Sequence, residues 1–527
     1  VRAGVTRGVS HSTHHSRDGD PVRCNPGGGA NALPPQPGAS RVHSLSLEST
    51  FLSRSMRAWA VAVALLASIF TPLLLRGDRT FGYMLAVPDY LHLSAGDYVH
   101  HVGNLLPTAS SPLESSAASA LLPPEKAAEL GSRRLLGYSC RTIFDALLPM
   151  LIAHNPDLVV AVSPFHHTSF IKILERHVRA ENIVALESDR ALTTLRLPSQ
   201  ANRPIGLVVV THVFGRDFDL SAIADAKNGE GEGSTAGGSF LLVEDRCQGG
   251  SLRKPFSHEA VDVALYSMGM DKRPIALGGG YANVRDLSSS LAFPLARGTS
   301  AGGGGGGGSA DFALARSLSA ELDALPVEST AQRAWALLLK TPTYAIYNLR
   351  AVQRLVVSGL YAGQQLGVLP TLASFAVSYR KANPGFEHAG YMKRPSTAAR
   401  RSMLWQLDNW LPIEREVGWR WQAFVAALGE DAAAELLPWA HQDSLSIYNA
   451  IWVTPARRQA LIAFAEAHGV ISMSNPTYKA IAVPADGWVQ QLMAGIVYLP
   501  CLSGLQGGQK EIDALAAILK EWVAGER

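Results

Sequence analysis

Short apolar runs alternate with polar or helical stretches between residues 139 and 300. Each run lacks polar interruptions, which is typical of strands buried on both faces of a sheet. Strands that alternate with helices indicate crossover connections, so the pattern predicts an α/β fold with a mainly parallel sheet and helices on both faces. The predicted strands are 158–163, 182–188, 205–213, 239–245 and 261–267.

The remainder of the chain follows a different pattern. From residue 310 onward the apolar positions recur at helical spacing in a segment rich in Ala, Leu and Trp. We interpret about 309–400 as a helical insert within a large domain over 77–410. The last part mixes strand-like runs with amphipathic helices, which predicts a smaller α+β domain over 411–527.

The N-terminal end is polar and then strongly apolar. Residues 1–55 are rich in Ser, Gly, Pro, His and Arg and predict a disordered or targeting tail. The hydrophobic segment 56–76 contains the uncharged run 58–75, and about 18 apolar residues nearly cross a hydrocarbon core of about 30 Å. It predicts membrane association through a single-pass anchor, or a targeting segment removed on the way to an organelle or the secretory pathway, or a buried helix. Basic residues flank both ends, so the side of the membrane stays open.

Composition narrows the classes of function. Of the 527 residues, 47% are hydrophobic and 17% charged, enough apolar surface for large cores. Lys and Arg number 47 against 44 Asp and Glu, and the net charge of +3 gives no general attraction for nucleic acid. The 4 cysteines contain no CxxC pair, so we expect reduced thiols that serve as small packing residues, and no metal site.

Three chemically different side chains follow the ends of neighbouring predicted strands. Asp245 ends the fourth strand, Ser267 ends the fifth, and Lys272 follows shortly afterwards. The carboxyl ends of parallel strands meet at the edge where α/β proteins bind ligands, so these groups should converge. Pyridoxal 5′-phosphate needs an amine for a Schiff base, a carboxylate for its pyridinium nitrogen, and donors for its phosphate. The pattern therefore predicts this cofactor, with Lys272 and Asp245 as catalytic residues.

These linked motifs resemble the DegT/DnrJ/EryC1/StrS aminotransferase family, the sugar aminotransferase branch of the fold-type I pyridoxal-phosphate enzymes. The similarity covers roughly residues 130–527 and is strongest over 139–285. Five segments match family motifs: 244–248 resembles Glu-Asp-Ala-Ala-Gln, 267–272 the Ser-x-x-x-x-Lys turn, 278–280 the glycine-rich strand start, 211–223 the His-x-x-Gly segment, and 163–170 the Pro-Ser-x-Thr-Phe segment.

The resemblance implies a role for each matched residue. Lys272 would form the Schiff base and, once released by substrate, move a proton between the substrate carbon and the cofactor. Asp245 would keep the pyridine nitrogen protonated, so that the ring accepts electrons. Gln248 would lie beside the ring, and Ser267 would hydrogen-bond the phosphate.

The start of a predicted helix should complete the phosphate site. The main-chain N–H groups around Ser139, Cys140 and Arg141 suit a dianion, and the Arg141 guanidinium would add a charge-assisted contact. His167 aligns with the family's ring-stacking aromatic residue, and His166 takes this place if the register differs by one.

The chain also departs from the family pattern. The usual Ser-Gly-Thr reads Ser-Cys-Arg at 139–141. The usual Asn-Tyr-Arg-x-Ser segment, which reaches the phosphate of the partner subunit, reads Met-Lys-Arg-Pro-Ser at 392–396, so Lys393 or Arg394 is expected to replace the lost asparagine.

The activity implied by the resemblance is amino transfer. An amino-acid donor, glutamate, would give its amino group to a keto acceptor, a nucleotide-linked keto-sugar, and the enzyme would be a homodimer. Two alternatives stay open: another fold-type I pyridoxal enzyme, such as a lyase or dehydratase, and a membrane-tethered family member without catalysis. Cofactor binding separates the last alternative from the first two.

Overall fold

The computed structural model describes most of the chain after residue 131. The described residues are 95–105, 132–199, 203–229, 240–269, 272, 276–285, 314–338, 388–437, 450–468, 470, 472–474, 478–484, 487–499 and 508–526. All belong to the compact unit Phe70–Arg527. The predicted tail 1–55 and the hydrophobic segment 56–76 lie outside the described residues. Within them, we find no helix with the length and apolarity needed to cross a bilayer.

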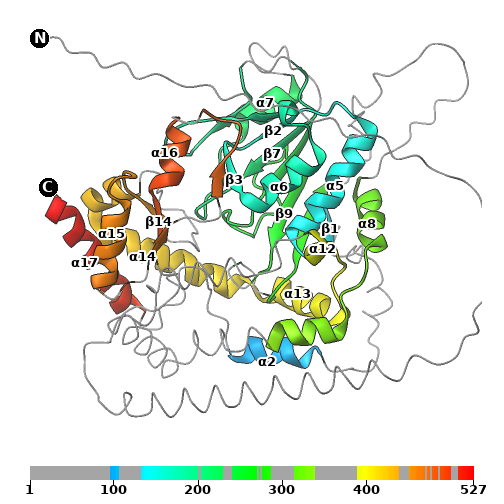
Figure 1. The fold of residues 1–527 in the computed structure, drawn as a ribbon. Coiled ribbons are helices and arrows are strands. Elements are labelled where there is room, and N and C mark those ends of the chain that lie inside the picture. Colours follow the sequence, from blue (N-terminus) through cyan, green and yellow to red (C-terminus); the bar gives the residue numbers. More distant parts are fainter. Residues whose placement is uncertain are drawn as a thin grey trace, which may run out of the picture. The chain divides into compact units, whose positions relative to one another are not determined.

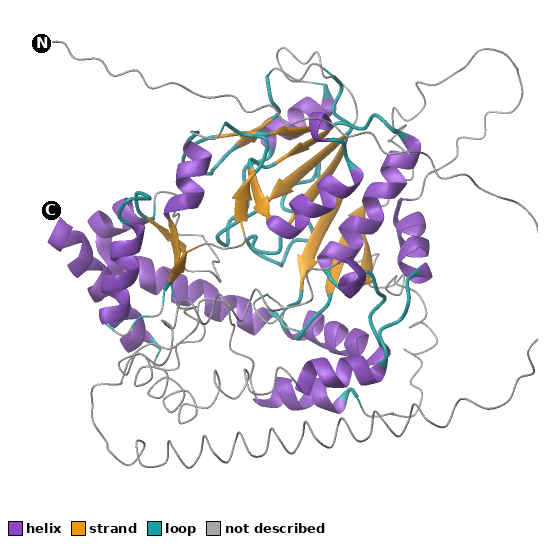
Figure 2. Cartoon of the chain, viewed as in Figure 1, coloured by secondary structure: helices purple, strands orange, loops and turns teal. Residues whose placement is uncertain are grey.

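A seven-stranded sheet forms the centre of this unit (Figure 2). Its strand order is β1-β10-β9-β8-β7-β2-β4, and the five strands from β9 to β4 run parallel. These five coincide with the five predicted strands, so the predicted mainly parallel sheet is confirmed. The parallel strands are β2 (Val160–Val162), β4 (Ile183–Ala185), β7 (Leu207–Thr211), β8 (Leu241–Asp245) and β9 (Val263–Ser267). The predicted run 182–188 also contains β5 (Glu187–Ser188), which pairs with β6 (Leu195–Arg196).

Two antiparallel strands extend the sheet on one side. The apolar pattern predicts neither of them, although the resemblance implies a strand that starts at the glycines 278–280. The two strands are β10 (Gly280–Arg285), which pairs with β9, and β1 (Ser132–Gly137), which pairs with β10. Both strands contain glycine and arginine, and β10 also contains asparagine, so neither shows a continuous apolar run. Arg134 Nε donates to Asn283 Oδ1 at 2.9 Å, so polar side chains pair here between neighbouring strands.

Alternate residues of the parallel strands pack against opposite faces, and helices cover both. On one face, Val209 and Val243 share a core with three helices: α5 (Cys140–His154), α6 (Thr168–His177) and α8 (Leu314–Ala324). On the other face, Val208 and Leu242 share a core with α7 (Ser221–Asn228) and α16 (Trp488–Gly495). Because helices cover both faces of the sheet, side chains on both faces of the strands are buried, which explains why the apolar runs show no alternation with polar residues. Figure 1 shows α5 and α6 against the sheet.

Helices dominate the middle of the chain, as the apolar spacing predicts. They are α12 (His388–Tyr391), α13 (Thr397–Asn409) and α14 (Leu411–Leu436), and α2 (Ala95–Gly103) packs on α13 through a stacked contact between His100 and Trp405 at 4.3 Å. Part of the predicted insert, 339–387, lies outside the described residues.

The C-terminal part contains a second small sheet with its own core. Strands β11 (Ala450–Trp452), β14 (Ile496–Tyr498) and β12 (Met473–Ser474) are antiparallel. Helices α15 (Arg458–Ala467) and α17 (Gln509–Glu526) share an apolar core with α14 and this sheet. Strand β13 (Tyr478–Ala480) instead pairs with β3 (Phe165–His167), which leads into α6. The short helix η3 (Ala180–Asn182) precedes β4. The domain boundary at 410/411 stays a prediction.

Candidate functional site

The C-terminal ends of three neighbouring strands form one edge of the sheet. Thr211 ends β7, Asp245 ends β8 and Ser267 ends β9, and the register pairs Thr211 with Asp245 and Asp245 with Leu265. Strand β10 starts at the same edge, because Gly280 pairs with Ser267. The structure thus brings Asp245 and Ser267, both predicted site residues, to one edge.

The N-terminus of α5 lies against the start of β10. A Cβ atom at Gly280 would lie 2.2 Å from the main-chain nitrogen of Cys140 and 2.9 Å from the carbonyl oxygen of Tyr266, so only glycine permits this approach. Ser139 caps the helix, since its hydroxyl accepts a hydrogen bond from the Thr142 N–H at 3.2 Å. The helix therefore directs the positive end of its dipole to the edge where β9 ends.

The glycine triplet before β10 also serves this packing. Gly279 has φ 109°, in the region that favours glycine, and a Cβ there would lie 2.2 Å from Met403 Sδ. In the sequence these glycines resemble the family's strand start, and they lack the spacing of a dinucleotide-binding loop. The structure assigns them to the close contact of β10 with α5 and α13.

Asp245 is almost completely buried at the centre of this edge, with 2% of its surface exposed. Its Oδ1 accepts a hydrogen bond from the Cys247 N–H at 2.9 Å. Its Oδ2 lies 3.8 Å from His166 Nε2. The loop after β8 and the histidine of β3 thus hold the carboxylate from two sides.

His166 is fully buried, and its ring stacks on Phe170 with centroids 4.5 Å apart. Its Nδ1 accepts a hydrogen bond from the His167 N–H at 2.9 Å, so the ring proton of the neutral form resides on Nε2, which faces Asp245. Burial lowers the pKa of His166 to about 4, although the charge of Asp245 opposes the shift. The ring is therefore neutral near pH 7.

His167 is half-buried and caps α6, where its Nδ1 lies 2.7 Å from Ser169 Oγ. The ring meets Tyr478 edge-on with centroids 5.7 Å apart. Burial first, and then the positive charges of Lys272 and Arg141, lower the pKa of His167 to about 3. Two cations that come from separate elements therefore both disfavour a positive charge on this ring.

Lys272 follows β9 in a turn in which its N–H donates to the carbonyl oxygen of Gly269 at 3.2 Å. Burial, Cys140 and Asp245 raise the pKa of the Cys247 thiol well above its usual range, and the charge of Lys272 opposes that rise. The positive charge of Lys272 thus lowers the pKa of His167 on β3 and opposes the rise in the pKa of Cys247 in the loop after β8. His167 and Cys247 both lie next to residues that flank Asp245, and the role of the Lys272 amine at this site stays a prediction.

Arg141, the second residue of α5, places its guanidinium 5.1 Å from the centre of the Tyr391 ring. Tyr391 also accepts a hydrogen bond from Thr142 Oγ1 through its carbonyl oxygen, at 2.7 Å. Its hydroxyl donates to Asp145 Oδ2 at 2.7 Å. Helix α12 therefore contacts the N-terminal half of α5, where the phosphate site is predicted, through Tyr391.

Three buried polar atoms of β3, β7 and the loop after β8 have no hydrogen-bond partner in the part of the chain that the structure describes. They are His166 Nε2, Thr211 Oγ1 and Gln248 Oε1. Leaving a buried polar atom without a partner costs about 1–3 kcal/mol, so such a group calls for an explanation. A polar ligand at this edge would supply the missing partners.

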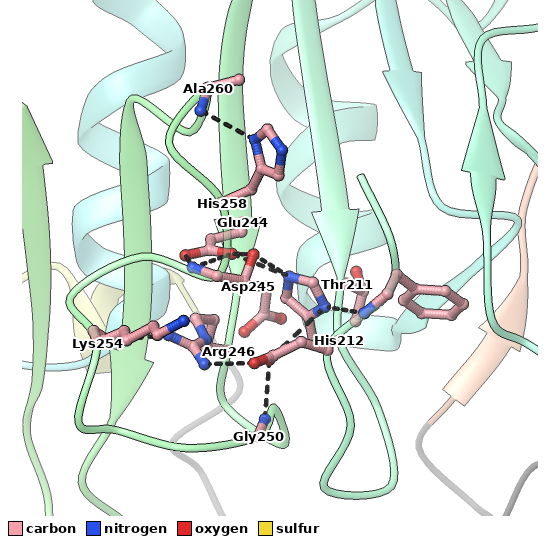
Figure 3. A network of polar contacts seen from close by, with 12 residues as sticks. Thr211, His212, Glu244, Asp245, Arg246, Gly250, Lys254, His258 and Ala260 are labelled. Atoms are coloured by element: carbon pink, nitrogen blue, oxygen red, sulfur yellow. Dashed lines mark hydrogen bonds and ion pairs between the residues drawn. The ribbon is translucent and has the colours of Figure 1, made fainter. Parts of the chain in front are cut away.

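A buried network fixes the end of β8 from the opposite face (Figure 3). His212 Nδ1 accepts a hydrogen bond from the Phe218 N–H at 2.9 Å, so Nε2 carries the proton and donates to Glu244 Oε2 at 2.9 Å. Glu244 also accepts from the Ser257 N–H at 3.0 Å and from the Ser257 hydroxyl. Since Glu244 precedes Asp245 in the strand, this network holds the Asp245 segment in place.

Arg246 departs from the family's alanine and is almost completely buried. Its Nη2 lies 2.8 Å from Asp217 Oδ2, and its Nη1 lies 3.0 Å from the Tyr266 hydroxyl. Asp217 also accepts from the Gly250 N–H at 2.9 Å. Arg246 thus points away from the Asp245 carboxylate and anchors the loop after β8. The sequence did not indicate this structural role of Arg246.

The segment expected to reach a partner subunit makes contacts within its own chain. Arg394 Nη1 lies 3.4 Å from Asp323 Oδ1, and its N–H donates to the carbonyl oxygen of Pro326 at 2.8 Å. Lys393 donates its N–H to the carbonyl oxygen of Tyr391. Among the described residues, no group of three His, Cys, Asp or Glu side chains is arranged to hold a metal ion.

Comparisons with known proteins place the fold. No protein-family model matches the sequence. No curated protein matches it either. The structure superimposes on PseC of Helicobacter pylori, described as an aminotransferase involved in the biosynthesis of pseudoaminic acid, with a TM-score of 0.52 and 10% identity over 83% of this chain and 98% of that one.

Two further structures are similar at lower scores. They are an aminotransferase from Psychrobacter cryohalolentis (TM-score 0.49, 12% identity, 84% of this chain and 99% of that one) and a sugar aminotransferase from Micromonospora echinospora (TM-score 0.46, 13% identity, 83% and 100%). The match to PseC shows that this chain has the fold-type I aminotransferase fold over almost the full length of that enzyme.

Proposed function

We propose that the chain is a pyridoxal 5′-phosphate-dependent aminotransferase of the DegT/DnrJ/EryC1/StrS type, which transfers an amino group from glutamate to a nucleotide-linked keto-sugar. One observation supports the proposal: Asp245, Ser267 and the N-terminus of α5 lie at the C-terminal edge of the parallel sheet, and the charge of Lys272 acts on His167 and Cys247 nearby. An amine, a carboxylate and an anion-binding helix end are the groups that this cofactor requires.

The buried polar atoms fit this cofactor. His166 Nε2, Thr211 Oγ1 and Gln248 Oε1 are without partners among the described residues. His166 Nε2 lies 3.8 Å from the buried Asp245 carboxylate and Thr211 pairs with Asp245 in the sheet, so a polar aromatic ring at this edge would satisfy groups that are otherwise costly to bury. The fold shared with PseC is consistent with the same assignment.

When bound, pyridoxal phosphate supplies an aldehyde that condenses with amines and a ring that withdraws electrons. Lys272 Nζ would hold the cofactor and, once displaced by the amino donor, carry a proton to and from the substrate carbon. Asp245 Oδ2 would hold the proton on the pyridine nitrogen, because Oδ1 is occupied by the Cys247 N–H.

The remaining residues bind and orient. The first N–H groups of α5, the Arg141 guanidinium and the Ser267 hydroxyl would bind the phosphate. His167 would present an uncharged ring face, since its pKa is held near 3. Gln248 would lie beside the ring.

The proposal includes a homodimer and membrane association through residues 58–75. In the dimer Lys393 is the stronger candidate for the cross-subunit phosphate contact, because Arg394 already pairs with Asp323. Sedimentation of the purified protein tests the dimer. Fractionation of cells that express the full chain or a 56–76 deletion tests the membrane association.

The decisive experiment is covalent trapping. The full chain is purified with pyridoxal phosphate, reduced with borohydride and digested, and mass spectrometry locates the modified peptide. We expect modification at Lys272 in the wild type and none in Lys272→Ala. The matched control is Lys172→Ala, since Lys172 is an exposed residue of α6; it should behave as the wild type.

Glutamate then tests the reaction class. Added to the loaded protein in the absence of an acceptor, it should release one equivalent of 2-oxoglutarate per site and change the visible absorbance of the cofactor. A protein that retains cofactor on Lys272 but leaves glutamate unchanged has a different donor or is a lyase or dehydratase. A wild-type protein that retains no cofactor is a non-catalytic member of the fold.

A further inference from the structure

Two of the chain's departures from the family motifs lie in contact with each other. Cys140 stands where the family has glycine and Cys247 where it has alanine. The two are 107 residues apart in the chain, yet their Sγ atoms are 3.3 Å apart. Cys140 is buried and Cys247 partly buried, and both are free thiols in the structure.

The thiol pair joins the two ends of the proposed cofactor site. Cys140 begins α5, where the phosphate is expected, and its main chain packs on Gly280. The Cys247 N–H donates to Asp245 Oδ1, where the ring nitrogen is expected. A bond between the two sulfur atoms would therefore tie the phosphate end of the site to the carboxylate end.

We propose that Cys140 and Cys247 are a modification site, at which a peroxide converts the two thiols into a reversible disulfide. One thiolate attacks a peroxide oxygen and releases water, and the second thiol displaces a second water from the resulting sulfenic acid. Two thiols and one hydrogen peroxide thus give one disulfide and two waters. A dithiol reductant reverses the step.

The geometry requires a small movement. A disulfide has its sulfur atoms about 2.05 Å apart, so the two segments must approach by about 1.3 Å if their side chains do not rotate. This approach draws the first turn of α5 toward the loop after β8. Its effect on the cofactor rests on the proposed function: the cross-linked site would fit pyridoxal phosphate less well, and bound cofactor would slow cross-linking by the same coupling.

The surroundings of the thiols set the conditions for the reaction. Cys247 faces Cys140 on α5, Asp245 in its own segment, Lys272 after β9 and Tyr281 on β10. Burial first, then Cys140 and Asp245, raise its pKa, and Lys272 opposes them. Because the thiolate is the reactive form, oxidation should be slow at pH 7 and faster at pH 9.

The test uses the full chain without cofactor, so that it does not depend on the proposed function. The reduced protein is treated with hydrogen peroxide at pH 9, free thiols are blocked with N-ethylmaleimide, and the digest is examined without reduction. We expect a cross-linked peptide pair that contains Cys140 and Cys247 and separates on addition of dithiothreitol. The Cys24→Ser/Cys501→Ser double variant should give the same pair. Sulfinic acid or maleimide at both positions, with no cross-linked pair, would overturn the proposal.

The coupling to cofactor is measured separately by equilibrium dialysis. Oxidation should raise the Kd of pyridoxal phosphate about tenfold or more, and prior loading should slow cross-linking. An unchanged Kd in the fully oxidised protein would overturn the coupling. A cross-link that forms in a protein that binds no cofactor in either state would support the thiol site and overturn the proposed function.

Discussion

Replacing Gly280 by alanine tests the contact that brings the phosphate site to the end of β9. A Cβ at this position would lie 2.2 Å from Cys140 N, 2.6 Å from Ser139 C and 2.9 Å from Tyr266 O. All three are main-chain atoms, so no side chain can rotate away. The start of α5 would have to move by about 1.2 Å to reach an ordinary contact distance, an overpacking that costs about 3 kcal/mol.

The expected result has two parts. The urea midpoint of Gly280→Ala should fall below that of the wild type by the equivalent of about 3 kcal/mol. Its Kd for pyridoxal phosphate should rise about 10-fold to 100-fold, because losing one hydrogen bond from α5 to the charged phosphate costs about 1.5–3 kcal/mol.

Gly525→Ala is the matched control for the stability measurement. Gly525 lies in α17, and a Cβ there would meet nothing within 4 Å. The substitution should be neutral or stabilise the protein by up to about 1 kcal/mol, because glycine is unfavourable in a helix. If Gly280→Ala has the stability and the cofactor affinity of Gly525→Ala, the reasoning about α5 is refuted.

Three further predictions concern single residues of the site. Arg141→Met should weaken binding of pyridoxal phosphate about 10-fold to 100-fold in equilibrium dialysis but leave binding of pyridoxal, which lacks the phosphate, unchanged; equal losses for both would exclude the phosphate contact. Asp245→Asn should still be trapped on Lys272 by borohydride but lose at least about 100-fold in the rate of 2-oxoglutarate release from glutamate; a normal rate would remove Asp245 from the mechanism. The pKa of His166 is about 4 in the folded protein and near 6.5 in the unfolded chain, so its stabilising effect is complete above pH 6.5 and is lost as the pH falls toward 4, by about 3 kcal/mol in total. The urea midpoints at pH 7 and pH 5 should therefore differ less in His166→Asn than in the wild type. Equal differences in the two proteins would contradict this prediction.

The sequence by itself determined the parallel part of the fold. Strands buried on both faces are apolar at every position, and crossover helices separate them. Both features are local in the sequence, so they can be predicted from the pattern of apolar residues alone. The same reasoning located Asp245 and Ser267, because strand ends in a parallel sheet share one edge. Lys272 came from its spacing after Ser267.

The antiparallel strands β1 and β10 were decided by tertiary structure. β10 starts at the glycines that resemble the family's strand start, but the apolar pattern does not show this strand, and the close contact of α5 with Gly280 is a tertiary contact that no local pattern records. Arg134 and Asn283 pair across these strands, although neither favours a strand in isolation. Their pairing partners are far away in the chain.

Tertiary structure alone also decided how the polar residues are distributed. The sequence left His166 and His167 as alternatives for one position, whereas the structure gives them separate places, one facing Asp245 and one acted on by Lys272 and Arg141. It turns Arg246 away from the carboxylate and brings the thiols of Cys140 and Cys247 into contact. A sequence pattern states which residue types a strand or helix carries, but contacts between residues a hundred positions apart depend on the packing of whole elements, since burial and pairing act through space and not along the chain.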